Sequence, residues 1–204
     1  MPIDYGKIAK DAWITSIKEF NLNDPKVQQK IKNWSKERNV NPVEVGKEIA
    51  NTTYFPLNFV KNPSRQSIHE KAQLDFLRNM PLITNLVKLP PKGKYTVRIP
   101  GVNKAIDCSF TVLPFGSRTT KLDCYAYLKY TYEPGGAQTN QRDDLLSFLD
   151  NCPISGQHCF VAFPDGAYYT KYIPVWQTKY DKPSKRRVFT LDEFEIYVSQ
   201  GKVI

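Results

Sequence analysis

The order of predicted helices and strands in the second half of the chain limits the fold more than any other feature of the sequence. Three segments alternate apolar and polar side chains with the period of two that is typical of strands, and a helix with an apolar stripe separates them from a short apolar segment. The predicted order is a helix at 64–80, strands at 94–99, 104–113 and 120–132, a helix at 137–151 and a strand at 158–163. This order predicts an α/β (or α+β) domain with a central mixed sheet flanked by helices.

The first sixty residues have helical patterns and clear helix starts. Asp24 precedes Pro25 and Asn41 precedes Pro42, and a capping side chain before a proline commonly begins a helix. This lysine-rich helix pair suits either a helix-turn-helix that contacts DNA or a pair that packs on a core. We therefore predict a helical extension at 1–60 and a core domain at 61–204, with its chemical motifs between 64 and 150.

The charge of the chain favours a polyanionic partner. Twenty-nine Lys and Arg against twenty Asp and Glu give a net charge of +9, and neutralising nucleic-acid phosphates releases condensed counterions. A basic protein without such a partner would have the same composition. No apolar run reaches the roughly 20 residues of a membrane span, and the first residues lack the apolar stretch of a secretory signal. We expect a cytoplasmic protein that does not contact a membrane.

The four cysteines are predicted to be small buried side chains. They are Cys108, Cys124, Cys152 and Cys159, and no two of them have the C-x2-C spacing of a zinc site. Cys108 and Cys124 also alternate with apolar neighbours inside predicted strands.

Two consecutive predicted strands place an acid and a base on one face. Asp107 and Lys129 both alternate with apolar neighbours, so they can meet on a common polar face if the strands pair. In the preceding helix, Glu70 shares a stripe with Leu74 and Leu77 and is carried toward the interior. Two carboxylates and a lysine suit metal-assisted phosphodiester hydrolysis, because oxygen ligands hold Mg²⁺ and the metal activates water. The alternatives are an exposed cross-strand ion pair and a buried glutamate paired with an arginine.

With these residues in this order, the chain resembles the PD-(D/E)XK nucleases, and in particular the type II restriction endonucleases. The resemblance covers about residues 64–163 and includes the GGAQTNQ that opens the later helix. It implies a restriction-endonuclease-like core, hydrolysis of duplex DNA, Mg²⁺ (which Mn²⁺ can replace) as cofactor, and a homodimer. By the same resemblance, Asp107 and Glu70 would help to hold the metal, Lys129 would contact the phosphate or the attacking water, and Gln138 would approach the site.

Position 127 departs from the family pattern. The pattern has Asp or Glu two residues before the lysine, whereas this chain has Tyr127, and tyrosine, with an ordinary pKa of about 10, is a poor ligand for Mg²⁺. Three explanations are open. The carboxylate has been substituted, leaving a chain that binds but cuts poorly; it has moved to the next helix, where Asp143 has the right spacing but is expected to face solvent; or the alignment differs.

Further side chains are predicted to contact nucleic acid. They are Arg118, Gln141, Lys182, Lys185, Arg186 and Arg187. The last four lie in a predicted loop, which follows a tyrosine-rich segment that we interpret as a strand, and a solvated hairpin loop is the alternative. Three functions are therefore considered: a metal-dependent endonuclease, a nuclease-derived module that binds without cutting, and an RNA-cleaving nuclease of the same fold.

Overall fold

The computed structural model describes residues 3–52, 55–60, 68–89, 106–117, 119–131, 136–152, 158–180 and 185–202. Contacts divide the chain into a helical unit, Asp4–His69, and a unit that contains the sheet, chiefly Glu70–Ile204. The described residues form seven α-helices, a short 3-10 helix and one five-stranded mixed sheet. The predicted α/β class is therefore confirmed.

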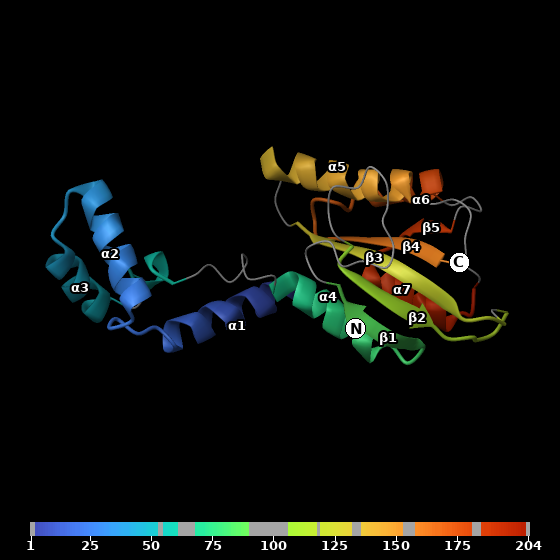
Figure 1. Cartoon of the computed structure of the whole chain (residues 1–204), viewed down its shortest axis with the longest axis horizontal. Coiled ribbons are helices and arrows are strands. Elements are labelled where there is room, and N and C mark those ends of the chain that lie inside the picture. Colours follow the sequence, from blue (N-terminus) through green and yellow to red (C-terminus); the bar gives the residue numbers. More distant parts are fainter. Residues whose placement is uncertain are drawn as a thin grey trace. The chain divides into compact units, whose positions relative to one another are not determined.

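The sheet combines antiparallel and parallel strand pairs (Figure 1). Its strands, in spatial order, are β1 (Ile83–Lys88), β2 (Cys108–Val112), β3 (Leu122–Tyr130), β4 (His158–Asp165) and β5 (Arg186–Val188). Strands β1, β2 and β3 pair antiparallel, whereas β3, β4 and β5 pair parallel. Parallel neighbours need a crossover connection, which α5 (Gly136–Asn151) and α6 (Ile173–Tyr180) supply.

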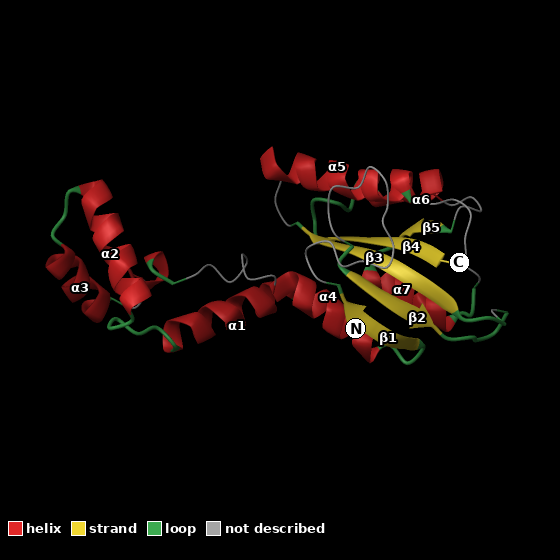
Figure 2. Cartoon of the chain, in the orientation of Figure 1, coloured by secondary structure: helices red, strands yellow, loops and turns green. Residues whose placement is uncertain are grey.

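Helices cover both faces of this sheet (Figure 2). On one face, α4 (Ile68–Asn79) and α7 (Leu191–Ser199) enclose a core that includes Ala126 and Leu128 of β3. On the other face, α5 and α6 enclose a second core that includes Tyr127. We expected this face of β3 to be polar. It instead belongs largely to an apolar core, because the leucines and Phe148 of α5 pack against it.

The strand β1 was not predicted from the sequence. Asn85 has a left-handed backbone (φ 53°), and the register with β2 shifts between Thr84 and Val87. This irregularity breaks the alternation on which strand prediction depends. The strand predicted at 94–99 lies outside the described residues. The alternation along 104–113 predicts that Ile106 shares a face with Cys108, Phe110 and Val112, but Ile106 lies in the second core and the other three lie in the first.

The tyrosine-rich segment is a turn followed by α6, and our interpretation of it as a strand is wrong. Trp176 and Tyr180 are four residues apart and both buried, which is helical spacing. The predicted loop that follows contains the short edge strand β5, in which Val188 is buried. All four cysteines are free and buried, as predicted.

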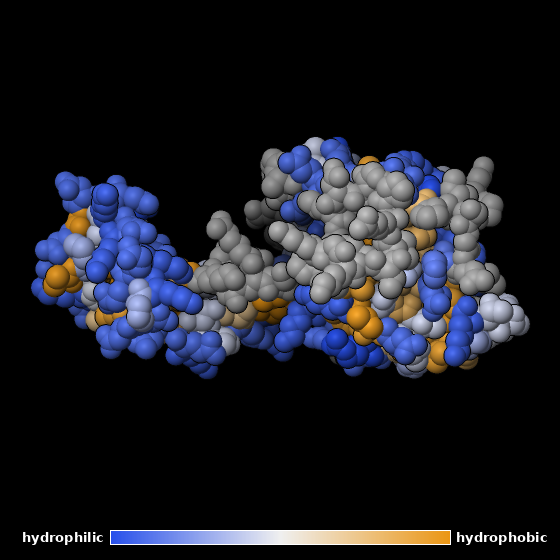
Figure 3. All heavy atoms as spheres, viewed as in Figure 1, coloured by the Kyte–Doolittle hydropathy of each residue, from blue (hydrophilic) through white to orange (hydrophobic). Residues whose placement is uncertain are grey.

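The helical unit consists of α1 (Tyr5–Lys18), α2 (Pro25–Arg38), α3 (Pro42–Asn51) and the 3-10 helix Phe55–Asn58. The side chains of Asp24 and Asn41 accept hydrogen bonds from the first turns of α2 and α3, so both predicted helix starts are confirmed. A small core forms from Ile31, Val45, Ile49 and Phe59. On the face shown in Figure 3, hydrophilic residues cover most of this unit. Among the described helices, none is both long and apolar enough to cross a membrane.

Candidate functional site

Two carboxylates and two lysines gather where β2 begins and β3 ends. Asp107 directly precedes β2, and Lys129 is the residue before the last in β3. Lys88 ends β1, opposite the first residue of β2, and Glu70 comes from α4. The charges of Glu70, Lys88 and Lys129 all act on the pKa of Asp107. We refer to these four residues as the strand-end cluster.

Asp107 is fixed by the backbone of the neighbouring strand. Its Oδ2 accepts a hydrogen bond from the backbone N–H of Leu128 at 2.7 Å. Strand β3 extends beyond the start of β2, and the aspartate side chain thus satisfies a strand N–H in place of a ladder carbonyl. The side chain is therefore held at the end of β3 before any ligand binds.

The Asp107 carboxyl is harder to ionise than an ordinary aspartate. Burial raises its pKa from 3.8 to about 6, and the negative charge of Glu70 adds to this effect. The positive charge of Lys129, the Leu128 N–H and the charge of Lys88 oppose it, in that order. A desolvated carboxylate of this kind gains from a nearby cation.

Glu70 is only partly buried, and a lysine neutralises it. Its Oε1 lies 2.6 Å from Nζ of Lys88, and the side chains of Glu70 and Lys88 are 26% and 55% exposed. We predicted an inward-facing glutamate and considered an arginine as its partner. The structure instead pairs it with a lysine on β1, a strand that the sequence pattern did not reveal.

Lys129 lies beside Tyr127, the position at which the family pattern has an acid. The Lys129 Nζ is 4.7 Å from the centre of the Tyr127 ring, a cation–π distance. The buried amide of Gln73 on α4 donates to the Lys129 carbonyl at 3.4 Å. The lysine backbone is thereby connected to α4, which also supplies Glu70.

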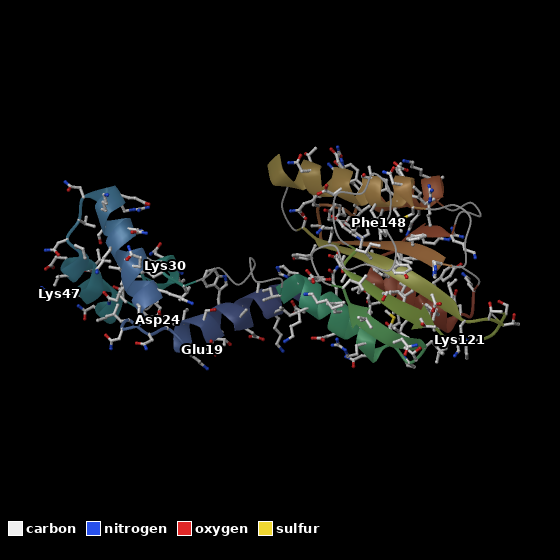
Figure 4. All side chains as sticks on the ribbon, in the orientation of Figure 1. Glu19, Asp24, Lys30, Lys47, Lys121 and Phe148 are labelled. Carbon is white, nitrogen blue, oxygen red and sulfur yellow. The ribbon has the colours of Figure 1, made fainter. Side chains whose placement is uncertain are left out.

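Tyr127 is a core residue of the face that α5 covers. It is 1% exposed and stacks on Phe148, which Figure 4 labels on α5, with ring centres 5.4 Å apart. Burial raises the pKa of its phenol far above the ordinary value, so it remains neutral. Its hydroxyl has no hydrogen-bond partner within the described part of the chain. The tyrosine therefore contributes packing and one free polar atom, but no negative charge.

The described residues supply two carboxylates for a metal ion rather than three. Asp143 is exposed and pairs with the neighbouring Arg142 at 2.9 Å. No three His, Cys, Asp or Glu side chains in the described ranges come together as a metal site. Asp107 and Glu70 remain compatible with Mg²⁺, because this ion keeps several waters and commonly binds through one or two carboxylates.

Sequence reasoning missed Asp144 and Thr131. Burial raises the pKa values of both Tyr127 and Tyr169, and the charge of Asp144 adds to both effects, so Asp144 lies near the core that α5 covers. Thr131, just past β3, donates through its hydroxyl to the Gln141 side chain at 3.1 Å. Gln141, Asp144 and Phe148 are three and four residues apart, a spacing that could have revealed this helix face.

Three of the six predicted nucleic-acid contacts, Gln141, Arg186 and Arg187, use their side chains in hydrogen bonds within the protein. Arg186 donates to the Cys152 carbonyl at the end of α5, and Arg187 donates to the Tyr180 carbonyl at 3.0 Å. The Lys185 carbonyl accepts from the Phe160 N–H. Arg118 and Lys182, and the side chain of Gln138, lie outside the described residues.

A groove of about 610 Å³ between α6, β5 and α7 is lined by Arg187, Glu193 and Tyr197 among others, and no residue of the strand-end cluster lines it.

Comparisons with family models, curated proteins and solved structures found no match for this chain. The resemblance to the PD-(D/E)XK nucleases therefore depends on the residues themselves.

Proposed function

We propose that this chain binds nucleic acid, in the first place duplex DNA, at the strand-end cluster, and hydrolyses its phosphodiester bonds weakly with Mg²⁺ or Mn²⁺. The observation that carries the proposal is the meeting of Asp107, Glu70 and Lys129 at the ends of β2, α4 and β3. Oxygen donors next to a lysine at a sheet end suit a phosphate and its metal. A basic chain with a net charge of +9 supports a polyanionic substrate.

Each residue has a separate task in this proposal. Asp107 and Glu70 would hold the metal ion, which supplies a water molecule of lowered pKa and offsets negative charge on the phosphate. Lys129 contacts a non-bridging phosphate oxygen or orients the attacking water. Lys88 neutralises Glu70 while no metal is bound and has to release it on binding. The Tyr127 ring excludes water from the floor of the site.

Tyr127 favours a second function, in which the same domain binds nucleic acid without cutting it. A neutral, buried phenol stands where the family pattern has a metal ligand, and it is integrated into the core by stacking on Phe148. Binding by phosphate contacts needs no metal, so such a module would keep Lys129 and lose only hydrolysis.

Cleavage of a mixed-sequence plasmid in Mg²⁺ or Mn²⁺ tests the proposal. We expect slow cutting by the natural sequence, and cutting at least about tenfold faster by Tyr127→Glu, the range over which single contacts at a metal site act. Asp107→Ala should abolish cutting. Tyr127→Phe, which keeps the ring and removes only the hydroxyl, is the size-matched control and should behave like the natural sequence.

Thermal melting of the same variants separates misfolding from loss of a ligand. Tyr127→Glu places a second carboxylate next to Asp107 in a buried region, so it should destabilise the fold without metal and recover in Mg²⁺. If neither the natural sequence nor Tyr127→Glu cuts, while duplex DNA is bound, the binding module replaces the nuclease. A dimer, which the family resemblance implies, is tested separately by sedimentation with and without DNA. Competition by RNA for binding of duplex DNA tests whether RNA is the substrate.

A further inference from the structure

A second group of polar side chains lies at the turn before α6 and on α5. Arg142 comes from α5, and Tyr168, Lys171 and Tyr172 come from the turn. We refer to these four residues as the tyrosine–cation cluster. None of them belongs to the strand-end cluster, and none is needed for the hydrolysis proposed above.

Both cations converge on one tyrosine. The Lys171 Nζ lies 4.9 Å from the centre of the Tyr172 ring, and the Arg142 Cζ lies 5.8 Å from it. Interactions of the Tyr172 hydroxyl with Lys171, first of all, and with Arg142 and Tyr168 lower the pKa of this phenol. The ring itself is held by stacking on Trp176, at 5.4 Å and 10° between planes. Cationic and hydroxyl groups from α5 and the turn thus surround one stacked ring.

The positive charge of this cluster is only partly compensated. No carboxylate pairs with Lys171 in the stretches that the structure describes. Arg142 binds Asp143, but that carboxylate is 57% exposed and adjacent in sequence. Exposed ion pairs contribute little to stability. Asp143 can therefore turn into solvent when a stronger anion binds to the guanidinium.

The turn is attached rigidly to the end of β3. The Tyr168 N–H donates to the Thr131 carbonyl at 3.2 Å, and Thr131 follows Lys129 by two residues. Gly166 has φ 94°, and a Cβ there would lie 2.3 Å from the same carbonyl oxygen. Gln141, next to Arg142, accepts from the Thr131 hydroxyl. Two hydrogen bonds of Thr131 thus connect the segments that carry the tyrosine–cation cluster to the chain two residues beyond Lys129 of the strand-end cluster.

We propose that Arg142, Lys171, Tyr168 and Tyr172 bind a phosphate group of nucleic acid, one that flanks the phosphate held at the strand-end cluster. Guanidinium, ammonium and phenol are the donors that commonly contact backbone phosphates, and such contacts fix register rather than read sequence. This inference rests on the proposed function, since it takes nucleic acid as the ligand. It assigns to the turn before α6 the positioning of the substrate strand.

The test measures binding of a labelled DNA duplex between 50 and 200 mM salt, roughly the range over which phosphate contacts weaken strongly. Lys171→Ala and Arg142→Gln should each weaken binding and reduce the slope of log affinity against log salt by about one. Lys179→Ala is the matched control. Lys179 also lies 4.9 Å from a tyrosine ring, that of Tyr180, but Asp150 pairs with it at 3.0 Å. Its removal should leave the slope unchanged.

Inorganic phosphate is the second probe, followed through the backbone amide resonances of Lys171 and Tyr172. Shifts with phosphate but not with chloride, together with reduced DNA slopes, support the proposal. If phosphate shifts these resonances but neither variant changes the slope of DNA affinity against salt, the proposal is overturned in favour of a site for free phosphate. Unchanged slopes without shifts overturn it entirely while leaving the nuclease proposal intact, because hydrolysis is read from Asp107→Ala. A natural sequence that neither binds nor cuts DNA overturns both proposals.

Discussion

At the scale of single residues, burial decides what the acidic groups can do. Asp107 keeps one hydrogen bond, from the Leu128 N–H, but loses most of its water. A carboxylate in that position costs free energy when ionised, and the nearby lysines offset only part of the cost. The same carboxylate is well placed to gain from a cation. A residue that destabilises the fold is thus the one on which the proposed activity most depends.

The pKa of Asp107 predicts how stability changes with pH. The folded protein holds this proton up to about pH 6, whereas the unfolded chain releases it near 3.8. Folding therefore takes up a proton between these values, and the contribution of Asp107 to stability falls as pH rises from about 4 to 6, by up to about 3 kcal/mol. Asp107→Asn, whose amide oxygen can accept the same hydrogen bond, should remove this fall.

Urea unfolding at pH 4 and pH 7 measures the effect. The variant should be more stable than the natural sequence at pH 7, and the difference should shrink at pH 4. Asp123→Asn is the control on the same strand pair, because Asp123 is exposed and its carboxylate accepts a hydrogen bond from the Thr111 hydroxyl. Equal pH profiles for Asp107→Asn and the natural sequence would contradict the raised pKa.

At the scale of elements, the end of β3 organises the site. It receives Asp107 from the start of β2, Gln73 from α4, Gln141 from α5, and the turn after β4. These connections span between 10 and 56 residues of sequence, so a pattern of near neighbours does not contain them. The turn is the most sharply constrained of them, because Gly166 lets two backbone segments approach closely.

Gly166→Ala should lower stability by at least about 2 kcal/mol, since it combines a left-handed backbone with a collision against the Thr131 carbonyl. It should also weaken DNA binding as much as Lys171→Ala does, because the turn carries that lysine. Gly46→Ala is the control: nothing lies within 4 Å of its Cβ position in α3, and alanine there should stabilise by about 0.5–1 kcal/mol. Thermal and urea unfolding give both values. A Gly166→Ala protein as stable as the natural sequence would show that the turn is not clamped.

At the scale of the whole molecule, the chain contains two units with separate cores. Among the residues that the structure describes, the core of the helical unit contains four buried apolar residues, and none of them belongs to the two cores on the faces of the sheet. A unit with so small a core is marginally stable. We therefore expect the two units to open independently.

Ile31→Ala tests this independence. Ile31 is 2% exposed, and truncating such a side chain costs about 2–5 kcal/mol. Hydrogen exchange should show that α2 and α3 lose protection while β3 and β4 keep theirs. Phe148→Ala, on α5, should do the reverse. Loss of protection in both units from either change would show a single cooperative fold.

The sequence by itself determined the elements whose signals are local. The period of two in β2 and β3, the stripe in α5 and the caps at Asp24 and Asn41 all depend on near neighbours, so they could be predicted. The approach of Asp107 to Lys129 was expected only if β2 and β3 paired, and the structure shows that they do. Strand β1, with its left-handed Asn85, lacked such a signal, whereas the helical spacing in α6 was present but short and was interpreted as a strand.

Only the tertiary structure decided which of the predicted site residues are buried, which are paired and which are exposed. The alternation of apolar and polar residues predicted that Tyr127 and Lys129 share a face. It did not predict that α5 would bury Tyr127 and leave Lys129 at the edge. It gave Glu70 an inward direction but not Lys88 as its partner. It marked Arg186 and Arg187 as cations, whereas folding turns both toward backbone carbonyls. The burial and the pairing of a side chain set the charge of a site, and both depend on residues that are far apart in the chain.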